Sequence, residues 1–171
     1  MNIHANKGPR AYTLVEMLLV VCLLGIAAAL VVPQMGSTDV LRVQSTVRAL
    51  ISDINYAQSD ALARQQGRAI VFDTVNNTYS IVEVRGSTLN PTTDTILKVD
   101  LKNARKFHDS RIVSASIDGG NTLVFDEMGG TVAAPNSTTP SSGGTIILSG
   151  SGSQFKISIE AYTGRVTVIK L

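Results

Sequence analysis

Hydrophobic residues follow three successive patterns along this chain. From Leu14 to Val32 nearly every residue is apolar, and Glu16 is the only charged one. From Thr38 to about Gln66 apolar residues recur at spacings of three, four and seven, which is typical of an amphipathic helix with one buried stripe. Beyond Gly67, short apolar runs are separated by turn residues, which is typical of strands. The sequence therefore predicts two helical segments followed by a β-rich domain.

The two helical segments are predicted to join through a bend. Pro33 and Gly36 lie between them, and the apolar period resumes beyond, so the proline should kink the helix rather than end it. Leu14 to Gln66 would then form one rod roughly 80 Å long, with Gly67 as its C-cap. One half of such a rod needs lipid or a helical bundle around it, and the stripe on the other half needs a sheet.

The β-rich region is predicted to form a mainly antiparallel sheet. Turn signals recur between short apolar runs, and hairpins of this kind favour antiparallel pairing. Asn76, Asn77 and Thr78 predict a tight turn, and 129–144, rich in Gly, Pro, Ser and Thr, predicts a mobile loop that is either an insertion or a binding loop. The predicted strands cover 68–75, 79–85, 95–101, 111–117, 122–125, 145–148, 155–160 and 166–169.

Charge gives the chain no general affinity for polyanions. It has 15 Lys and Arg against 13 Asp and Glu, but Lys7 and Arg10 precede the apolar segment, and 13 residues of each sign remain after them. A neutral remainder offers no global attraction to nucleic acid or to acidic substrates. The single cysteine, Cys22, cannot form an intrachain disulfide and is interpreted as a small apolar residue of the span.

The residues around the start of the apolar segment carry a specific motif. Ala11, Tyr12, Thr13, Leu14, Val15 and Glu16 provide a small residue, an aromatic residue and Thr-Leu-x-Glu. This arrangement resembles the class III signal of type IV prepilins, although that family usually has Gly before the cut and Phe after it. The resemblance implies that a prepilin peptidase cuts between Ala11 and Tyr12, methylates the new amine and leaves the apolar segment in place. An ordinary signal peptide is cut after its apolar core instead. An unprocessed single-span anchor is the alternative.

A carboxylate within a membrane span needs a partner. Its cost is about 2–3 kcal/mol near the bilayer centre. Cleavage after Ala11 would place an amine on Tyr12, about one helical turn before Glu16. The resemblance implies that Glu16 of one filament subunit neutralises the Tyr12 amine of the next, and that Pro33 stands where type IV pilins commonly have a proline. Alternatively, Glu16 reaches the lipid headgroups.

The flanking charges predict the orientation and the domain boundaries. Lys7 and Arg10 precede the span, so the positive-inside rule keeps the N-terminus in the cytoplasm and sends the remainder of this single-pass inner-membrane protein into the periplasm. The predicted segments are a leader at 1–11, a membrane and filament-core helix at 12–33, an amphipathic helix at 34–67 and a periplasmic β-rich domain at 68–171.

Three segments of the β-rich region extend the resemblance, namely 67–73, 125–129 and 157–168. Together they resemble the GspH/FimT type of minor pilins and pseudopilins. The resemblance implies an α+β fold, in which a long N-terminal α-helix packs on a mainly antiparallel, β-sandwich-like domain. It also implies several partners: other pseudopilins or pilins in a helical filament, the prepilin peptidase, an inner-membrane assembly platform and an exoprotein cargo.

Two functions follow from this resemblance. The first is a minor pseudopilin of a type II secretion system, assembled into a periplasmic pseudopilus that promotes export of folded proteins across the outer membrane. The second is a FimT-like minor type IV pilin for pilus assembly or DNA uptake. DNA capture needs clustered cations, and DNA-binding members have Gly-Arg-x-Arg near the C-terminus. Here Arg165 keeps the first arginine, Thr167 replaces the second, and only Lys170 follows, which argues against nucleic acid binding.

Neither an enzyme nor a cofactor is predicted. His4 and His108 have no cysteine or second histidine near them in sequence, and Gly-x-Ser-x-Gly and phosphate-binding loops are missing. Asp126 and Glu127, beside Gly129, are the one candidate for calcium, but they lack an EF-hand pattern.

Overall fold

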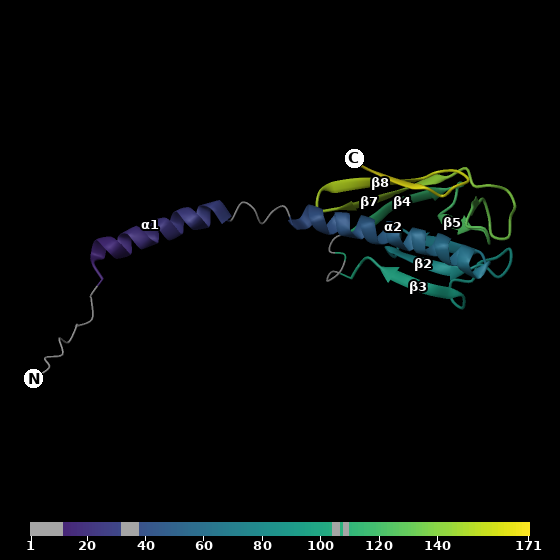
Figure 1. Ribbon diagram of the computed structural model, residues 1–171, viewed down its shortest axis with the longest axis horizontal. Coiled ribbons are helices and arrows are strands. Elements are labelled where there is room, and N and C mark those ends of the chain that lie inside the picture. The colour runs from purple at the N-terminus through teal and green to yellow at the C-terminus, as the bar shows by residue number, and fades with distance from the viewer. Residues whose placement is uncertain (1–11, 32–37, 104–106, 108–109) are drawn as a thin grey trace, which may run out of the picture. The chain divides into compact units, whose positions relative to one another are not determined.

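The computed structural model describes residues 12–31, 38–103, 107 and 110–171. It divides into two compact units, 1–37 and 38–171, which are described separately (Figure 1). In the first unit, α1 spans Leu14–Val31, and its described side chains are exposed. Among the described residues, no helix is both long enough and apolar enough to cross a membrane. The bend predicted at Pro33 and Gly36 lies outside the described residues.

The second unit begins with α2, Thr38–Arg64, whose buried stripe confirms the predicted amphipathic helix. Apolar residues recur along it at alternating spacings of four and three, and the least exposed are Val43, Val47, Leu50, Ile54, Ala57 and Ala61. Such a stripe is buried only if other elements cover it.

The C-cap predicted at Gly67 is wrong, because α2 ends two residues earlier than expected. Gln65 takes the left-handed conformation (φ 51°). Its N–H donates to the Leu62 carbonyl, and the Gln66 N–H donates to the Ala61 carbonyl at 3.1 Å. This pair of bonds is a Schellman motif, which a non-glycine residue occupies here. Gly67 is needed for close packing instead, since a Cβ there would lie 3.0 Å from the Val84 Cβ.

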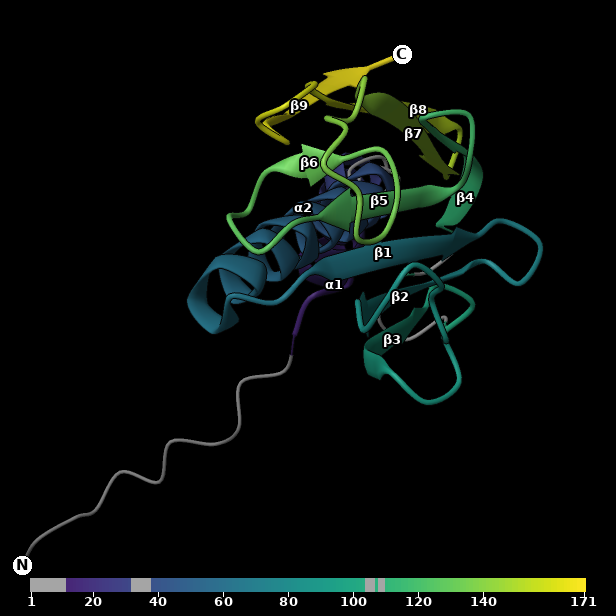
Figure 2. The same ribbon diagram turned by 90° about the vertical axis from the view of Figure 1, so that its right-hand side faces the viewer.

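The strands form two antiparallel sheets (Figure 2). One has the order β3-β2-β1-β5-β6 and the other β4-β7-β8-β9. The strand bounds in the described chain are β1 Arg68–Asp73, β2 Thr78–Glu83, β3 Thr95–Asp100, β4 Arg111–Ile117, β5 Thr122–Phe125, β6 Thr131–Val132, β7 Gly144–Gly150, β8 Ser153–Ile159 and β9 Val166–Lys170.

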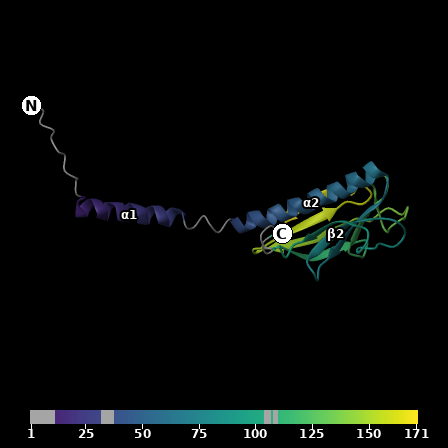
Figure 3. The same cartoon turned by 90° about the horizontal axis from the view of Figure 1, so that it is seen from below.

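Helix α2 lies along both sheets and joins them into one core (Figure 3). Its stripe packs with inward residues of β1, β2 and β5 from one sheet and of β7 and β8 from the other. The Gln58 amide on α2 donates to the Gly129 carbonyl at 2.7 Å and to the Thr163 carbonyl at 3.0 Å, which lie in turns of different sheets. The predicted α+β fold of a helix packed on antiparallel sheets is thereby confirmed.

A buried tyrosine provides a second tie between α2 and a sheet. The Tyr79 hydroxyl, on β2, donates to Asp53 on α2 at 2.5 Å. Burial raises the pKa of Tyr79, and the bond to the Asp53 carboxylate raises it further. The phenol therefore stays neutral and keeps its proton for this bond at any ordinary pH.

The segment predicted as a mobile loop, 129–144, is more ordered than expected. It contains β6, which pairs with β5. Its end is tied to the corner between β4 and β5, where Asp118 accepts hydrogen bonds from the Ser141 hydroxyl and from the hydroxyl and N–H of Ser142. Polar residues that suggested a loop thus supply the bonds that hold it.

At the end of this segment, Gly144 packs so closely against β4 that no side chain could be accommodated. Gly144 lies in β7 between Ile117 of β4 and Ile159 of β8. A Cβ at this position would lie 2.7 Å from the Ile117 Cα and nearer still to the Ser116 carbonyl oxygen.

We expect Gly144→Ala to destabilise the domain by about 3 kcal/mol, because the methyl group must displace atoms of Ser116 and Ile117 in β4, two of them in the backbone. Urea unfolding of the purified chain measures this. Gly120→Ala is the matched control, because the nearest atom to its added Cβ is the Ile117 oxygen at 3.7 Å. Equal free energies of unfolding for the two variants would contradict this prediction, because they would show that β4 and β7 can move apart to admit the methyl group without loss of stability.

Candidate functional site

The N-terminal motif lies at the start of α1. The Thr13 hydroxyl accepts the Glu16 N–H at 3.2 Å, and the Thr13 carbonyl accepts the Met17 N–H. Thr13 is therefore the N-cap, and Glu16 is in the first turn, where the helix dipole favours a negative charge. Tyr12 precedes the helix and is 76% exposed. Ala11 and Pro33 lie outside the described residues.

Sequence reasoning missed the capping function of Thr13. Thr-x-x-Glu before an apolar run is the capping-box pattern, in which the side chains of the two residues accept backbone N–H groups of the first helical turn. The bond from the Glu16 N–H to the Thr13 hydroxyl is the half of this pattern seen here. The same four residues therefore fix where α1 begins, independently of any peptidase. No hydrogen bond or ion pair occupies the Glu16 carboxylate among the described residues, so it stays available.

The two cations considered for nucleic acid lie near the C-terminus. Arg165 follows the turn between β8 and β9 and forms a two-pronged ion pair with Glu160, with an Nε–Oε2 distance of 2.9 Å. The Arg165 hydrogen bond lowers the pKa of Glu160, so the carboxylate stays charged at neutral pH. The positive charge of Arg165 is thus compensated, while Lys170 is exposed on β9. Sequence reasoning missed Glu160, although its position five residues before Arg165 could have suggested the pair.

Of the two carboxylates considered for calcium, Asp126 stabilises its own turn. Asp126 accepts the N–H groups of Met128 and Gly130 at 2.9 and 2.8 Å, which closes its own turn. Within the described ranges, no group of three or more His, Cys, Asp or Glu residues lies close enough together to hold a metal ion.

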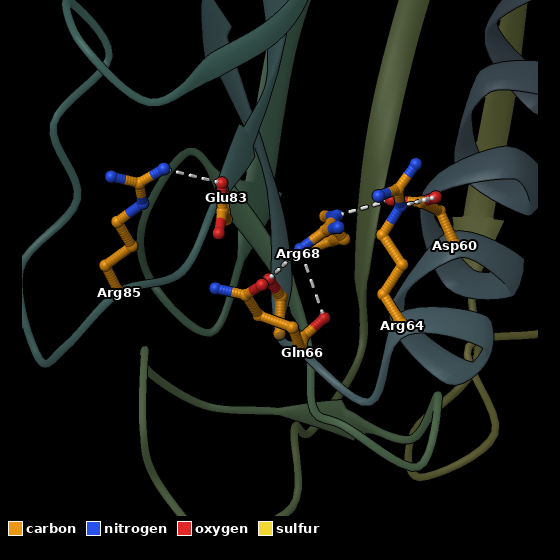
Figure 4. A network of polar contacts seen from close by, with 7 residues as sticks. Asp60, Arg64, Gln66, Arg68, Glu83 and Arg85 are labelled. Carbon is orange, nitrogen blue, oxygen red and sulfur yellow. Dashed lines mark hydrogen bonds and ion pairs between the residues drawn. The ribbon is translucent and has the colours of Figure 1, made fainter.

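An ion-pair network joins the end of α2 to β1 (Figure 4). The Arg68 side chain on β1 is 3% exposed, and its Nε lies 2.6 Å from Oδ2 of Asp60 on α2. It also donates to the Gly67 carbonyl at 3.1 Å. Arg64 binds the other Asp60 oxygen at 2.8 Å from the solvent side. The network holds the helix end against the sheet.

Comparison with solved structures identifies the class of fold. The chain resembles the type IV minor pilin FimU of Pseudomonas aeruginosa in two crystal forms, at 20% identity in each. The matches cover 74% of this chain and 87% or 91% of FimU, with TM-scores of 0.52 and 0.50. Such a likeness establishes a pilin-type fold.

Comparison with protein families is more specific. A family model described as type II transport protein GspH matches residues 46–164, well over half of the chain. The chain therefore belongs to the GspH family, whose members are pilin-like, and its role is that of a minor pseudopilin or pilin in a filament. No curated protein matches it closely.

We expect Asp60→Asn to destabilise the domain by about 3 kcal/mol, because Arg68 would keep a buried charge without its counter-ion. Arg64→Ala is the control, since Arg64 is 66% exposed and exposed ion pairs contribute at most about 1 kcal/mol. Urea unfolding at pH 7 measures both. A smaller effect for Asp60→Asn than for Arg64→Ala would contradict this account.

The same difference should depend on pH. Burial alone would raise the pKa of Asp60, but hydrogen bonds and charges from Arg64 and Arg68 outweigh it and lower that pKa. The stabilisation is therefore complete above the ordinary pKa of 3.8 and is lost as pH falls through the lower folded value. The stability gap between wild type and Asp60→Asn should shrink below that pH.

Proposed function

We propose that this protein is a minor pseudopilin of a type II secretion system, and that its assembly into a periplasmic pseudopilus promotes export of folded proteins across the outer membrane. Membership of the GspH family supports this role most directly. The apolar segment 12–33 would anchor the chain in the inner membrane and later lie in the filament core. Its sequence supports that assignment, since Leu14 to Val32 contains one charge.

The proposed assembly chemistry pairs two charges that each need a partner in an apolar environment. Cleavage between Ala11 and Tyr12 would create an amine on Tyr12, which the peptidase then methylates. The Glu16 carboxylate of one subunit would neutralise this amine on the next subunit. Burying either charge alone is costly, and the pair offsets that cost. Capping by Thr13 supports the proposal, because the Thr13 hydroxyl bonds the Glu16 N–H, and among the described residues the Glu16 carboxylate has no partner.

The proposed processing is tested by the intact mass and N-terminal sequence of the chain recovered from membranes, with and without the prepilin peptidase. We expect a chain that begins at N-methylated Tyr12 only when the peptidase is present. Ala11→Gly should increase the processed fraction, and Ala11→Arg should abolish processing. A chain that still begins at Met1, or that has lost its apolar segment, would refute the pilin-type pathway.

The alternative is a FimT-like minor pilin involved in pilus assembly or DNA uptake. One observation disfavours DNA uptake: Glu160 compensates the charge of Arg165, so that phosphate contacts would have to break an existing ion pair. Lys170 by itself gives little of the clustered charge that DNA binding requires.

Deleting the gene separates the two functions. We expect lower release of exoproteins into the medium, unchanged DNA uptake, and restoration by the wild-type chain but not by Glu16→Ala. Arg165→Ala, which removes the arginine considered for phosphate contacts, should restore secretion fully. Loss of DNA uptake with normal secretion would instead establish the FimT-like role.

A further inference from the structure

Strand β9 forms one edge of the sheet β4-β7-β8-β9. It pairs with β8 in continuous register from Val166↔Ile159 to Lys170↔Phe155. Leu171 donates to the Gln154 carbonyl, and the Arg165 carbonyl accepts the Glu160 N–H. Because inward and outward backbone groups alternate along an antiparallel strand, the N–H and C=O groups of Val166, Val168 and Lys170 point away from β8. These three residues present a free row of donors and acceptors.

The other edges of the described sheets are protected. The pairing of β3 with β2 shifts register between Ile81 and Val82, and β3 carries Lys98 within it. The pairing of β4 shifts between Ile112 and Ser114, and β6 is two residues long and bridged to Pro140. Bulges, charges and short length are the usual devices against edge pairing. Strand β9 has a regular register and a single charge, at its last residue.

A small groove lies next to this unprotected edge, between α2 and β9. Its volume is about 240 Å³. Val47 and Phe155 are almost fully buried in its floor, whereas Val168 is 37% exposed at its side. The residues that line it include one cation, Arg48, and no carboxylate; they are Gln44, Val47, Arg48, Ile51, Phe155 and Val168. By register, Lys170 shares the face of Val168.

We propose that β9 is a docking edge to which a neighbouring filament subunit adds an extended strand. The free groups of Val166, Val168 and Lys170 would bind its backbone, as in other cases of strand addition. Alternate side chains of the added strand would be apolar where they meet the groove. An acidic side chain would fit best near Arg48 and Lys170. The source of the strand rests on the proposed filament function, whereas the docking edge itself does not.

A polypeptide fits this surface better than a nucleic acid. Only another extended chain presents donors and acceptors that alternate with the spacing of a strand. The cation that immediately precedes β9, Arg165, already binds Glu160, and Lys170 is the one charge within the strand. The exposed apolar side chains of Ile169 and Leu171 (54% and 58%) would gain nothing from phosphates.

The experiment uses the full chain in detergent micelles and follows amide hydrogen exchange along β9. The probe is a short acetylated, amidated peptide that alternates valine with threonine or glutamate. Its control is the same peptide N-methylated at alternate residues, which keeps the side chains but cannot pair with an edge. We expect the first peptide alone to slow exchange at Val168 and Lys170. The inward amides of Thr167 and Ile169 should be slow already.

Variants connect this protection to the edge. Val168→Pro removes an outward N–H without removing a bond to β8, so the fold is expected to survive while peptide affinity falls about tenfold. Val168→Thr keeps the N–H and the branched shape and should bind like wild type. Arg48→Glu, on an exposed helix position, should weaken binding of the glutamate-containing peptide and provides a second variant if Val168→Pro fails to fold.

Three results would overturn the inference: no protection by the peptide, equal protection by the N-methylated peptide, or protection by a DNA duplex instead. The test of the docking edge can fail or succeed independently of the test of the proposed filament function. Protection of β9 in a chain that is never processed at Tyr12 would refute the filament pathway and leave the docking edge standing. Processing at Tyr12 without any response at β9 would refute the docking edge alone.

Discussion

The buried stripe of α2 is the constraint on which the rest of the domain depends. A helix of 27 residues with apolar side chains along one face is stable in water only when that face is covered. Neither sheet covers it alone, so β1 and β5 from one sheet and β7 and β8 from the other meet on it. Gln58 then fixes a turn of each sheet, and the Asp60–Arg68 pair fixes the helix end. The helix therefore packs against two sheets that, in the described chain, have no strand pairing in common.

Periodicity was sufficient to predict the elements but not their partners. The strands around Ile70, Ile81 and Ile157 were predicted within a few residues, because alternation is a local property. The resemblance implied a sandwich of two sheets, but the local pattern could not predict which strands belong to which sheet, since the corner at Asp118 has the same turn residues as a hairpin. Strand β6 was missed because two residues give no period. The helix end was misplaced because glycine at 67 is the commoner left-handed residue, whereas the structure uses Gln65.

The candidate site residues also differ in how far the sequence alone could predict them. Tyr12 and Glu16 could be singled out because their residue types are unusual at the edge of an apolar segment. The pairing of Arg165 with Glu160 could not, because it depends on how the turn between β8 and β9 folds back. That pairing changes the interpretation of the C-terminus, since a residue that looks like a phosphate ligand in sequence is neutralised in the structure. Counting cations alone overestimates the positive surface of this domain.

Charge compensation in the domain limits how it can associate. Arg64, Arg68, Arg85 and Arg165 each have a carboxylate partner, and exposed pairs of this kind contribute little further attraction for a macromolecule. Directional association then falls to groups that these pairs leave unoccupied. In the described chain these include the Glu16 carboxylate on α1 and the outward backbone of β9. Under the two proposals made above, the carboxylate would pair with an amine in an apolar environment, and the β9 edge would pair with an extended strand. A neighbouring subunit of the same pilin type would bring both: an amine at its processed N-terminus and strands in its globular domain.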